Sequence, residues 1–256
     1  MHSSHSCAIF AAGTYYGGEP HGDAIDADTL VIAADGGLDH ARRLGVHADI
    51  VIGDFDSLPG GAPGTCDAGP ESPEVIALPP EHDDPDMLSA LKVGWSRGAR
   101  TFRIYGGLGG RIDHTIANIQ MLALLAHNGG HGMLFGRRGV VTAIADGSLA
   151  FHAGALPAQE RNRMVSVFSH GDVSRGVTIA GLKYELHDGV MRGDTVLGVS
   201  NEFLDERPAS IGVRDGTLIV VFPSQAIFPA FSTTIVPAET LGPLSSQVSS
   251  LLNPSR

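Results

Sequence analysis

Short apolar runs alternate with amphipathic segments along the first 145 residues of the chain. Most of the runs lack polar alternation, which is typical of strands buried on both faces of a sheet. Strands that alternate with helices favour a parallel sheet covered by helices. The predicted strands are 7–12, 29–34, 50–52, 75–78, 101–105 and 132–135, with a further candidate at 140–145, and the predicted helices are 38–44, 86–97 and 114–127.

The pattern changes near residue 153, beyond which short β-rich pieces are separated by turns rich in Gly and Asp. No helical period appears among these pieces, which favours an antiparallel domain of the sandwich or barrel type. The predicted strands here are 164–169, 176–180, 195–199, 208–213 and 217–222. We therefore expect an α/β catalytic domain with a mostly parallel sheet over 1–150, a small all-β, sandwich-like domain over 160–222, and a weakly ordered or docking tail over 223–256.

Composition and charge narrow the classes of function. The 256 residues are 43% apolar and 18% charged, which is ordinary for a soluble globular protein. The net charge is −11 and no run is rich in Lys or Arg, so we expect no nucleic-acid partner. No stretch approaches the roughly 18 apolar residues of a membrane span, and the polar start does not resemble a signal peptide. With only Cys7 and Cys66 and no C-x-x-C pair, we expect a cytoplasmic protein with no membrane partner.

Two carboxylates follow one of the most apolar runs. The stretch Gly53-Asp54-Phe55-Asp56-Ser57 comes directly after residues 50–52. Side chains two residues apart in a strand point to the same face, so Asp54 and Asp56 are expected to converge. Adjacent carboxylates repel unless a cation lies between them, and hard oxygen ligands favour Mg²⁺ or Ca²⁺. We interpret this pair as half of a site for Mg²⁺ and phosphate.

Further aspartates follow predicted strands or open predicted helices. Asp35 lies in Ala34-Asp35-Gly36-Gly37, and others are Asp83, Asp84, Asp86 and Asp113. In an open parallel sheet, ligands bind outside the carboxyl ends of the strands, where these residues are predicted to lie. The alternative for each is a solvated turn residue or a helix cap, and it is favoured for Asp83 and Asp84 taken singly. Asp84 in particular can cap the helix that opens at Asp86.

A glycine-rich segment, Gly106-Gly107-Leu108-Gly109-Gly110-Arg111, joins the predicted strand 101–105 to the next helix. Such a turn lets backbone N–H groups approach phosphate, and the helix N-terminus adds positive potential. It is neither a P-loop, since Gly-Lys-Ser/Thr is absent, nor the dinucleotide fingerprint, since Ile112 stands at the third glycine position. A tight turn alone would also explain the glycines. Arg111 favours the phosphate interpretation, because guanidinium binds phosphate through two hydrogen bonds.

Together these motifs resemble the thiamine pyrophosphokinase family. Segments 34–37, 49–57 and 106–118 resemble its catalytic domain, and segments 176–186 and 200–202 resemble its small β domain. The similarity runs in order over about residues 7–222. It implies an α/β domain joined to a β-sandwich, and a homodimer with thiamine near the interface. It also implies the reaction ATP + thiamine → AMP + thiamine diphosphate, with Mg²⁺.

Site residues follow from matching positions. The resemblance implies that four carboxylates bind metal and act on the phosphate side, and that Ser200 and Asn201 lie beside thiamine. The family's segment before the helix reads roughly Lys-Asp-x-Thr-Asp, so His82 and Pro85 depart from it while both carboxylates remain. The four catalytic and metal-binding carboxylates are Asp54, Asp56, Asp86 and Asp113; the expected nucleotide-side residues are Asp35, Gly36, Gly107, Gly109, Gly110 and Arg111.

Two alternatives stay open. A diphosphokinase for another hydroxymethyl heterocycle, such as a pterin, would share the ATP and Mg²⁺ side, and the sequence Ser200-Asn201-Glu202 favours thiamine over it. The second alternative is a regulator that binds thiamine or nucleotide without turnover. The full set of carboxylates argues against this alternative. Which carboxylate acts as general base is left undecided by the sequence.

Overall fold

The computed structural model describes residues 6–17, 25–55, 72–81, 83–245 and 248. Three residues of the predicted motifs, Asp56, Ser57 and His82, lie outside these ranges. The chain divides into two compact units, which are described separately: the first unit holds residues 1–112 and 239–256, and the second unit holds residues 113–238. Among the described residues, none of the helices is long and apolar enough to span a membrane.

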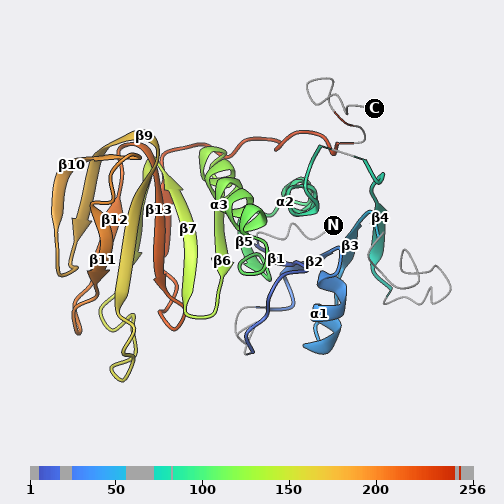
Figure 1. Cartoon of the computed structure of the whole chain (residues 1–256), viewed down its shortest axis with the longest axis horizontal. Coiled ribbons are helices and arrows are strands. Elements are labelled where there is room, and N and C mark those ends of the chain that lie inside the picture. Colours follow the sequence, from blue (N-terminus) through green and yellow to red (C-terminus); the bar gives the residue numbers. More distant parts are fainter. Residues whose placement is uncertain (1–5, 18–24, 56–71, 82, 246–247, 249–256) are drawn as a thin grey trace. The chain divides into compact units, whose positions relative to one another are not determined.

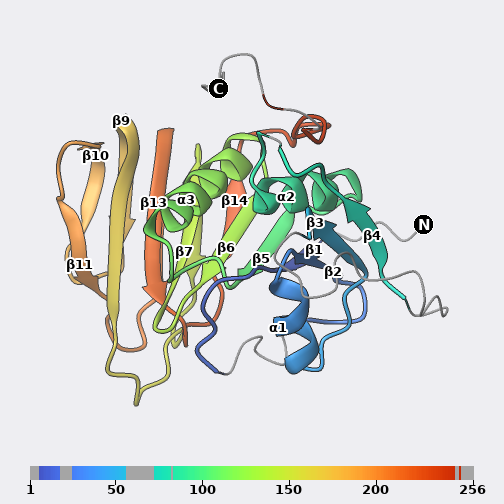
Figure 2. The same cartoon turned by 45° about the vertical axis from the view of Figure 1, so that its right-hand side comes forward.

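The first unit is built on five parallel strands in the order β5-β1-β2-β3-β4. Residues at the centre of this sheet, such as Ile9, Ile32 and Val51, have no exposed surface, as unalternated apolar runs predict. Helices α1 and α2 lie on opposite sides of these strands (Figures 1 and 2). The elements are β1 (Ser6–Phe10), β2 (Leu30–Ala34), α1 (Gly37–Arg43), β3 (Ile50–Gly53), β4 (Glu74–Ala77), α2 (Asp86–Ser96) and β5 (Thr101–Tyr105).

In the second unit, strands pair antiparallel in the order β14-β8-β12-β9-β13-β7-β6, and β10 and β11 also pair with β9. Figure 2 shows the long strand β9 beside β13. Helix α3 and strands β6 and β7, which the sequence pattern places with the α/β half, group with this unit, as does β8. The elements are α3 (Ile112–His127), β6 (His131–Phe135), β7 (Gly139–Ala145), β8 (Gly147–Phe151), β9 (Met164–Ala180), β10 (Leu186–Arg192), β11 (Gly198–Glu202), β12 (Ala209–Gly212), β13 (Asp215–Pro223) and β14 (Ala230–Thr233).

The mixed α/β character and the predicted elements of the first unit are confirmed, with ends that move by one or two residues. The predictions for the β-rich half were less accurate. Segments 164–169 and 176–180 are one strand, β9, because Gly171 (φ +99°) continues the strand where it was expected to end it. The strand predicted at 195–199 is β11, which begins three residues later, at Gly198. A turn in which the Thr195 N–H donates to the Arg192 carbonyl occupies the predicted start. Strands β8, β10 and β14 were not predicted.

Part of the predicted tail packs on the second unit. Strand β14 pairs with β8, and the Phe231 ring stacks on His131 with 4.4 Å between centroids. Phe228 meets Phe135 edge to face at 5.6 Å, and the Ile227 N–H donates to the Ala155 carbonyl at 2.7 Å. Residues 226–235 therefore contribute aromatic packing and strand pairing to this unit.

Candidate functional site

Adjacent loops at the carboxyl ends of β2 and β3 hold Asp35 and Asp54. The Asp35 N–H donates to the Ile52 carbonyl at 2.8 Å, and Asp35 has a left-handed backbone (φ +48°). Gly53 lies directly against it, because a Cβ at Gly53 would be 3.2 Å from Asp35 Cα. Asp54, the next residue, therefore leaves the sheet beside Asp35, and both are half-buried. This is the carboxyl rim at which open parallel sheets bind ligands.

Close packing at this rim explains the glycines after Asp35. A Cβ at Gly37 would lie 2.0 Å from the Phe10 carbonyl oxygen, so no larger residue fits there without a backbone shift. At Gly36 a Cβ would approach Ala12 Cβ to 3.2 Å. The backbone that opens α1 thus lies against the segment that follows β1. Phe55, on the other side of Asp54, is buried with φ +58°, and Asp56 falls outside the described residues.

The glycine-rich loop packs on the same segment after β1. Gly106, Gly109 and Gly110 all have positive φ (+69°, +84° and +70°), a backbone conformation that favours glycine at these positions. The Gly13 N–H donates to the Gly106 carbonyl at 3.0 Å. A Cβ at Gly109 would come within 2.5 Å of the Tyr16 hydroxyl oxygen. The tight-turn explanation therefore holds for these glycines, and it is compatible with a phosphate-binding role for the loop.

Sequence reasoning did not single out the segment 11–16 as part of this rim. The Tyr15 ring stacks on His40 of α1 with 4.0 Å between centroids, and its hydroxyl donates to the Ala11 carbonyl at 3.1 Å. Burial, helped by the nearby Arg43 charge, lowers the pKa of His40, which favours a neutral ring in the stack. The available signal was position alone: the segment follows a strand of a parallel sheet, as Asp35 and Asp54 do.

The acidic segment before α2 differs from its prediction. The helix begins at Asp86 after Pro85, and no side chain caps it, so the prediction that Asp84 caps this helix is wrong. Asp84 Oδ2 instead accepts a hydrogen bond from Lys92 Nζ at 2.6 Å and one from the Ser245 N–H at 3.1 Å. The two charged side chains are only 11% and 12% exposed. A buried ammonium needs a carboxylate partner, and that requirement outweighs the smaller benefit of a cap.

Asp113 lies in the first turn of α3, where an acidic side chain interacts favourably with the helix dipole. Its Oδ1 accepts the His114 N–H at 3.0 Å, and the side chain is exposed. Arg111, just before the helix, is exposed as well. Both residues are accessible to a ligand.

The carboxylates that the structure describes suit Mg²⁺ by donor chemistry, since it prefers hard oxygen ligands. Asp35 and Asp54 share a rim, and Asp86 opens α2. Within the described ranges no group of three His, Cys, Asp or Glu side chains is close enough to hold a metal. The partner predicted for Asp54, Asp56, is outside those ranges, so the predicted convergence of the pair stays a prediction.

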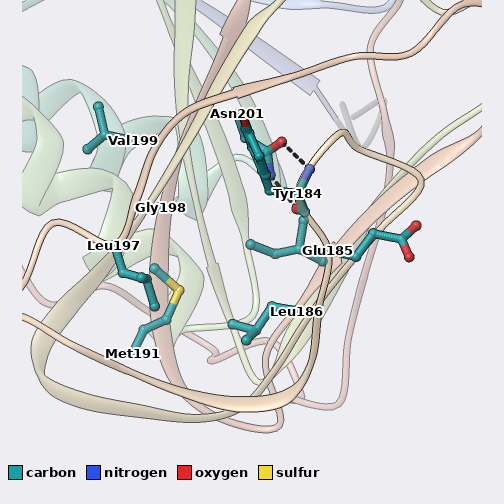
Figure 3. A pocket seen from close by; sticks show the side chains of 9 residues that line it. Tyr184, Glu185, Leu186, Met191, Leu197, Gly198, Val199 and Asn201 are labelled. Atoms are coloured by element: carbon teal, nitrogen blue, oxygen red, sulfur yellow. Dashed lines mark hydrogen bonds between the residues drawn. The ribbon is translucent and has the colours of Figure 1, made fainter.

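The second unit contains an apolar hollow of about 180 Å³. Figure 3 shows Leu186, Met191 and Leu197 around it, with Tyr184 and Asn201 at one side. The remaining lining residues are Ile179, Glu185, Gly198 and Val199. The hollow is bordered by β9, β10 and β11, and β11 holds both predicted thiamine-side residues, Ser200 and Asn201.

Asn201 orders the segment that contains Tyr184. It is 5% exposed, its Oδ1 accepts N–H groups from Tyr184 (3.0 Å) and Glu202 (2.9 Å), and its Nδ2 donates to the Tyr184 carbonyl at 2.6 Å (Figure 3). The Tyr184 side chain is itself 64% exposed. Ser200 is exposed with φ +59°, and its N–H donates to Ser166 Oγ at 3.1 Å. Of the two predicted thiamine-side residues, Ser200 is the more accessible.

Two family models match the chain in order. The thiamin pyrophosphokinase catalytic domain matches residues 22–131, and the thiamin pyrophosphokinase vitamin B1 binding domain matches residues 155–218, together more than half of the chain. The chain is 24% identical over 196 residues to the thiamine pyrophosphokinase of Bacillus subtilis (strain 168), a match that covers 77% of this chain and 88% of that protein.

Solved structures show the same fold. A thiamine pyrophosphokinase from Bacillus subtilis aligns with TM-score 0.70 and 21% identity, covering 85% of this chain and 98% of that one. A thiamin pyrophosphokinase from Geobacillus thermodenitrificans aligns with TM-score 0.70 and 23% identity, covering 90% of this chain and 99% of that one. The yeast thiamin pyrophosphokinase aligns with TM-score 0.65 and 14% identity over 86% of each. Because both domain models match in sequence order and the fold agrees, the chain belongs to the thiamin pyrophosphokinase family.

Proposed function

We propose that this chain transfers the diphosphoryl group of ATP to the hydroxyl of thiamine, giving thiamine diphosphate and AMP. The observation that carries the proposal is the occurrence of both family domains, in order, in one chain. It agrees with the arrangement of the first unit, where carboxylates and a glycine-rich loop follow parallel strands. We place the reaction in the cytoplasm.

The nucleotide side is assigned to the loops after the parallel strands. Positioning and charge neutralisation supply most of the rate in phosphoryl transfer, so the groups that hold the triphosphate matter most. When bound, Mg²⁺ neutralises phosphate charge and orients the reacting oxygens. We assign its ligands, and the groups that orient the thiamine hydroxyl, to Asp54, Asp56, Asp86 and Asp113; we assign ATP binding to Asp35, Gly36, Gly107, Gly109, Gly110 and Arg111.

The thiamine side is assigned to the second unit, for which we propose a sandwich-like β domain. The exposed face of Tyr184 suits a thiazolium cation, which an aromatic ring attracts through its π-electrons. Ser200 is an accessible hydroxyl on the neighbouring strand β11. Asn201 then acts by holding the backbone of Tyr184 in place.

We further propose that the protein is a homodimer that uses the β9–β11 region of the second unit. Large apolar side chains are exposed there, at Val190 (56%), Val196 (78%), Leu197 (69%) and Met164 (58%). Met164 lies in β9, Val190 lies in β10, and Val196 and Leu197 lie in the segment that joins β10 to β11. Exposed apolar side chains of this size are available to an interaction surface. Sedimentation at micromolar concentration tests this directly: a monomer alone would reject the dimer.

The reaction is tested by AMP release from ATP and Mg²⁺ with thiamine, with a pterin alcohol, or with no acceptor. We expect release only with thiamine, and a loss of about 10²-fold or more in Asp54→Asn, because a metal ligand contributes several kcal/mol to the transition state. Asp194→Asn, at an exposed carboxylate of the second unit, is the matched control. Activity with the pterin alone would favour the alternative diphosphokinase. Thiamine binding without turnover would favour the regulator.

The thiamine side is tested separately by isothermal titration of Tyr184→Leu. We expect much weaker thiamine binding and little change in the binding of a non-hydrolysable ATP analogue. Equal weakening of both ligands would indicate a folding defect, and unchanged thiamine affinity would remove Tyr184 from the site. This variant is preferable to Asn201→Ala, which removes three hydrogen bonds that order the segment.

A further inference from the structure

A short piece of the C-terminal tail, residues 239–245, is hydrogen-bonded to the acidic segment before α2. The Lys92 Nζ donates to the Pro243 carbonyl at 2.8 Å, and the Ser245 N–H donates to Asp84 Oδ2 at 3.1 Å. The Asp83 N–H donates to Ser245 Oγ at 3.3 Å. All of these residues belong to the first unit. We call residues 239–245 the C-terminal strap.

The strap completes the surroundings of a buried ion pair. Lys92 and Asp84 are eight residues apart, their charged atoms are 2.6 Å apart, and about a tenth of each side chain is exposed. Charged groups removed from water need further hydrogen bonds beyond their mutual attraction. The strap supplies one hydrogen-bond acceptor, the Pro243 carbonyl, to the ammonium, and one donor, the Ser245 N–H, to the carboxylate. The ion pair and the strap therefore hold each other in place.

This clamp acts on the residues directly before Asp86. Pro85 lies between Asp84 and Asp86 with φ −55°, an angle that its ring keeps nearly constant. The Pro85 carbonyl accepts the Leu88 and Ser89 N–H groups at 2.8 and 3.1 Å, which joins the segment to the first turn of α2. With Asp83 and Asp84 held by the strap and Pro85 restricted, few rotations remain that could move the start of the helix.

We propose that the C-terminal strap positions Asp86 for diphosphoryl transfer, acting through the Asp84–Lys92 pair. The role in catalysis rests on the proposed function, while the ordering of the acidic segment does not. The strap lies outside both regions that match the family models, residues 22–131 and 155–218. Asp84 stands at the variable position of the family's Lys-Asp-x-Thr-Asp segment, so the clamp is a property of this chain.

The test compares two shortened chains with the full chain. One ends at Ala238 and lacks the strap, and the control ends at Val248 and keeps it. Without the strap we expect amides of residues 86–89 to exchange hydrogen at least tenfold faster, and the Mg²⁺ concentration for half-maximal rate to rise at least tenfold. The KM for thiamine should stay within twofold. The control should match the full chain in all three measurements.

Lys92→Met in the full chain keeps the test decisive if the chain ending at Ala238 does not fold. This variant removes the contacts of the ammonium with Asp84 and Pro243. We expect the same faster amide exchange and the same rise in the Mg²⁺ concentration for half-maximal rate. In the chain ending at Ala238 the substitution should add little, because strap and ion pair act as one unit.

Two results would overturn the proposal. Equal amide exchange with and without the strap would show that it does not order the segment. Faster exchange with unchanged Mg²⁺ dependence and kcat would show that the strap only stabilises the fold. If even the full chain releases no AMP with thiamine, the proposed function fails and the catalytic role with it, while the exchange comparison still decides whether the strap orders residues 86–89.

Discussion

His131 is expected to make the protein less stable in mild acid. It is 5% exposed at the start of β6, and burial lowers the pKa of its ring from 6.5 to about 4. Its Nε2 lies 2.9 Å from Thr142 Oγ1, which itself donates to the Gly132 carbonyl at 2.7 Å. The threonine oxygen therefore accepts the Nε2 proton of a neutral ring. Phe231 covers the ring by stacking on it.

The size of the effect follows from the difference between the two pKa values. Because the folded pKa lies below the unfolded one, the unfolded state binds the proton more tightly, and stability falls as the pH falls below 6.5. At about 1.4 kcal/mol per pKa unit, the full loss is about 3 to 4 kcal/mol once the pH is well below the folded pKa. Between about pH 7.5 and pH 5, the expected loss is roughly 2 kcal/mol.

Urea unfolding of wild type and His131→Gln, followed by circular dichroism at both pH values, measures this loss. Gln can still donate to Thr142 but does not titrate, so its own cost appears equally at both pH values. All other side chains are the same in both proteins, so their contributions cancel in the comparison. Wild type should lose about 2 kcal/mol more than the variant between the two pH values. Equal losses within about 0.5 kcal/mol would refute the assignment of a strongly lowered pKa to His131.

Three further outcomes follow from the packing. Lys92→Met should lower the free energy of unfolding by about 3 kcal/mol, because it leaves the buried Asp84 carboxylate without its ammonium partner. Adding Asp84→Asn should restore part of this loss, and urea titration of both variants would measure it. Asn201→Ala should cost about 2 kcal/mol in the same titration, since two backbone N–H groups lose their acceptor. Gly37→Ala should lower the melting temperature strongly because of the 2.0 Å approach to the Phe10 carbonyl, whereas Gly212→Ala, with 3.4 Å of space, should change it little.

Local pattern was sufficient where burial is uniform along an element. Strands β1, β2 and β3 consist mainly of apolar residues buried on both faces, so each was predictable from its own few residues. The aspartates after β2 and β3 were predictable for the same reason, because a parallel sheet brings the carboxyl ends of its strands to one rim. Neither inference needs information from distant parts of the chain.

Turn signals misled where a strand continues through them. Turns rich in Gly and Asp are expected to separate the β-rich pieces, yet His187-Asp188-Gly189 lies inside β10, where Asp188 has φ +48° and the register with β9 shifts. Gly171 has the same effect in β9. A glycine or aspartate marks a backbone of unusual φ, and the surrounding pairing decides whether that backbone becomes a turn or a bulge. That pairing is a tertiary property, so it was not available from the segment alone.

Asp84 and Asn201 show the same limit within the candidate site. Each stands in or beside a family motif. The helix cap predicted for Asp84 from its neighbours in sequence is wrong, whereas the thiamine-side position that the resemblance implies for Asn201 stays a prediction. In the structure, Asp84 binds Lys92 and a backbone N–H 161 residues away, and Asn201 binds the backbone of a residue 17 positions away. Because a buried polar group takes whichever partner the fold brings to it, motif position identifies the region of a site more reliably than the task of each side chain. For this chain, the residues that hold a motif in place are therefore as informative to test as the motif itself.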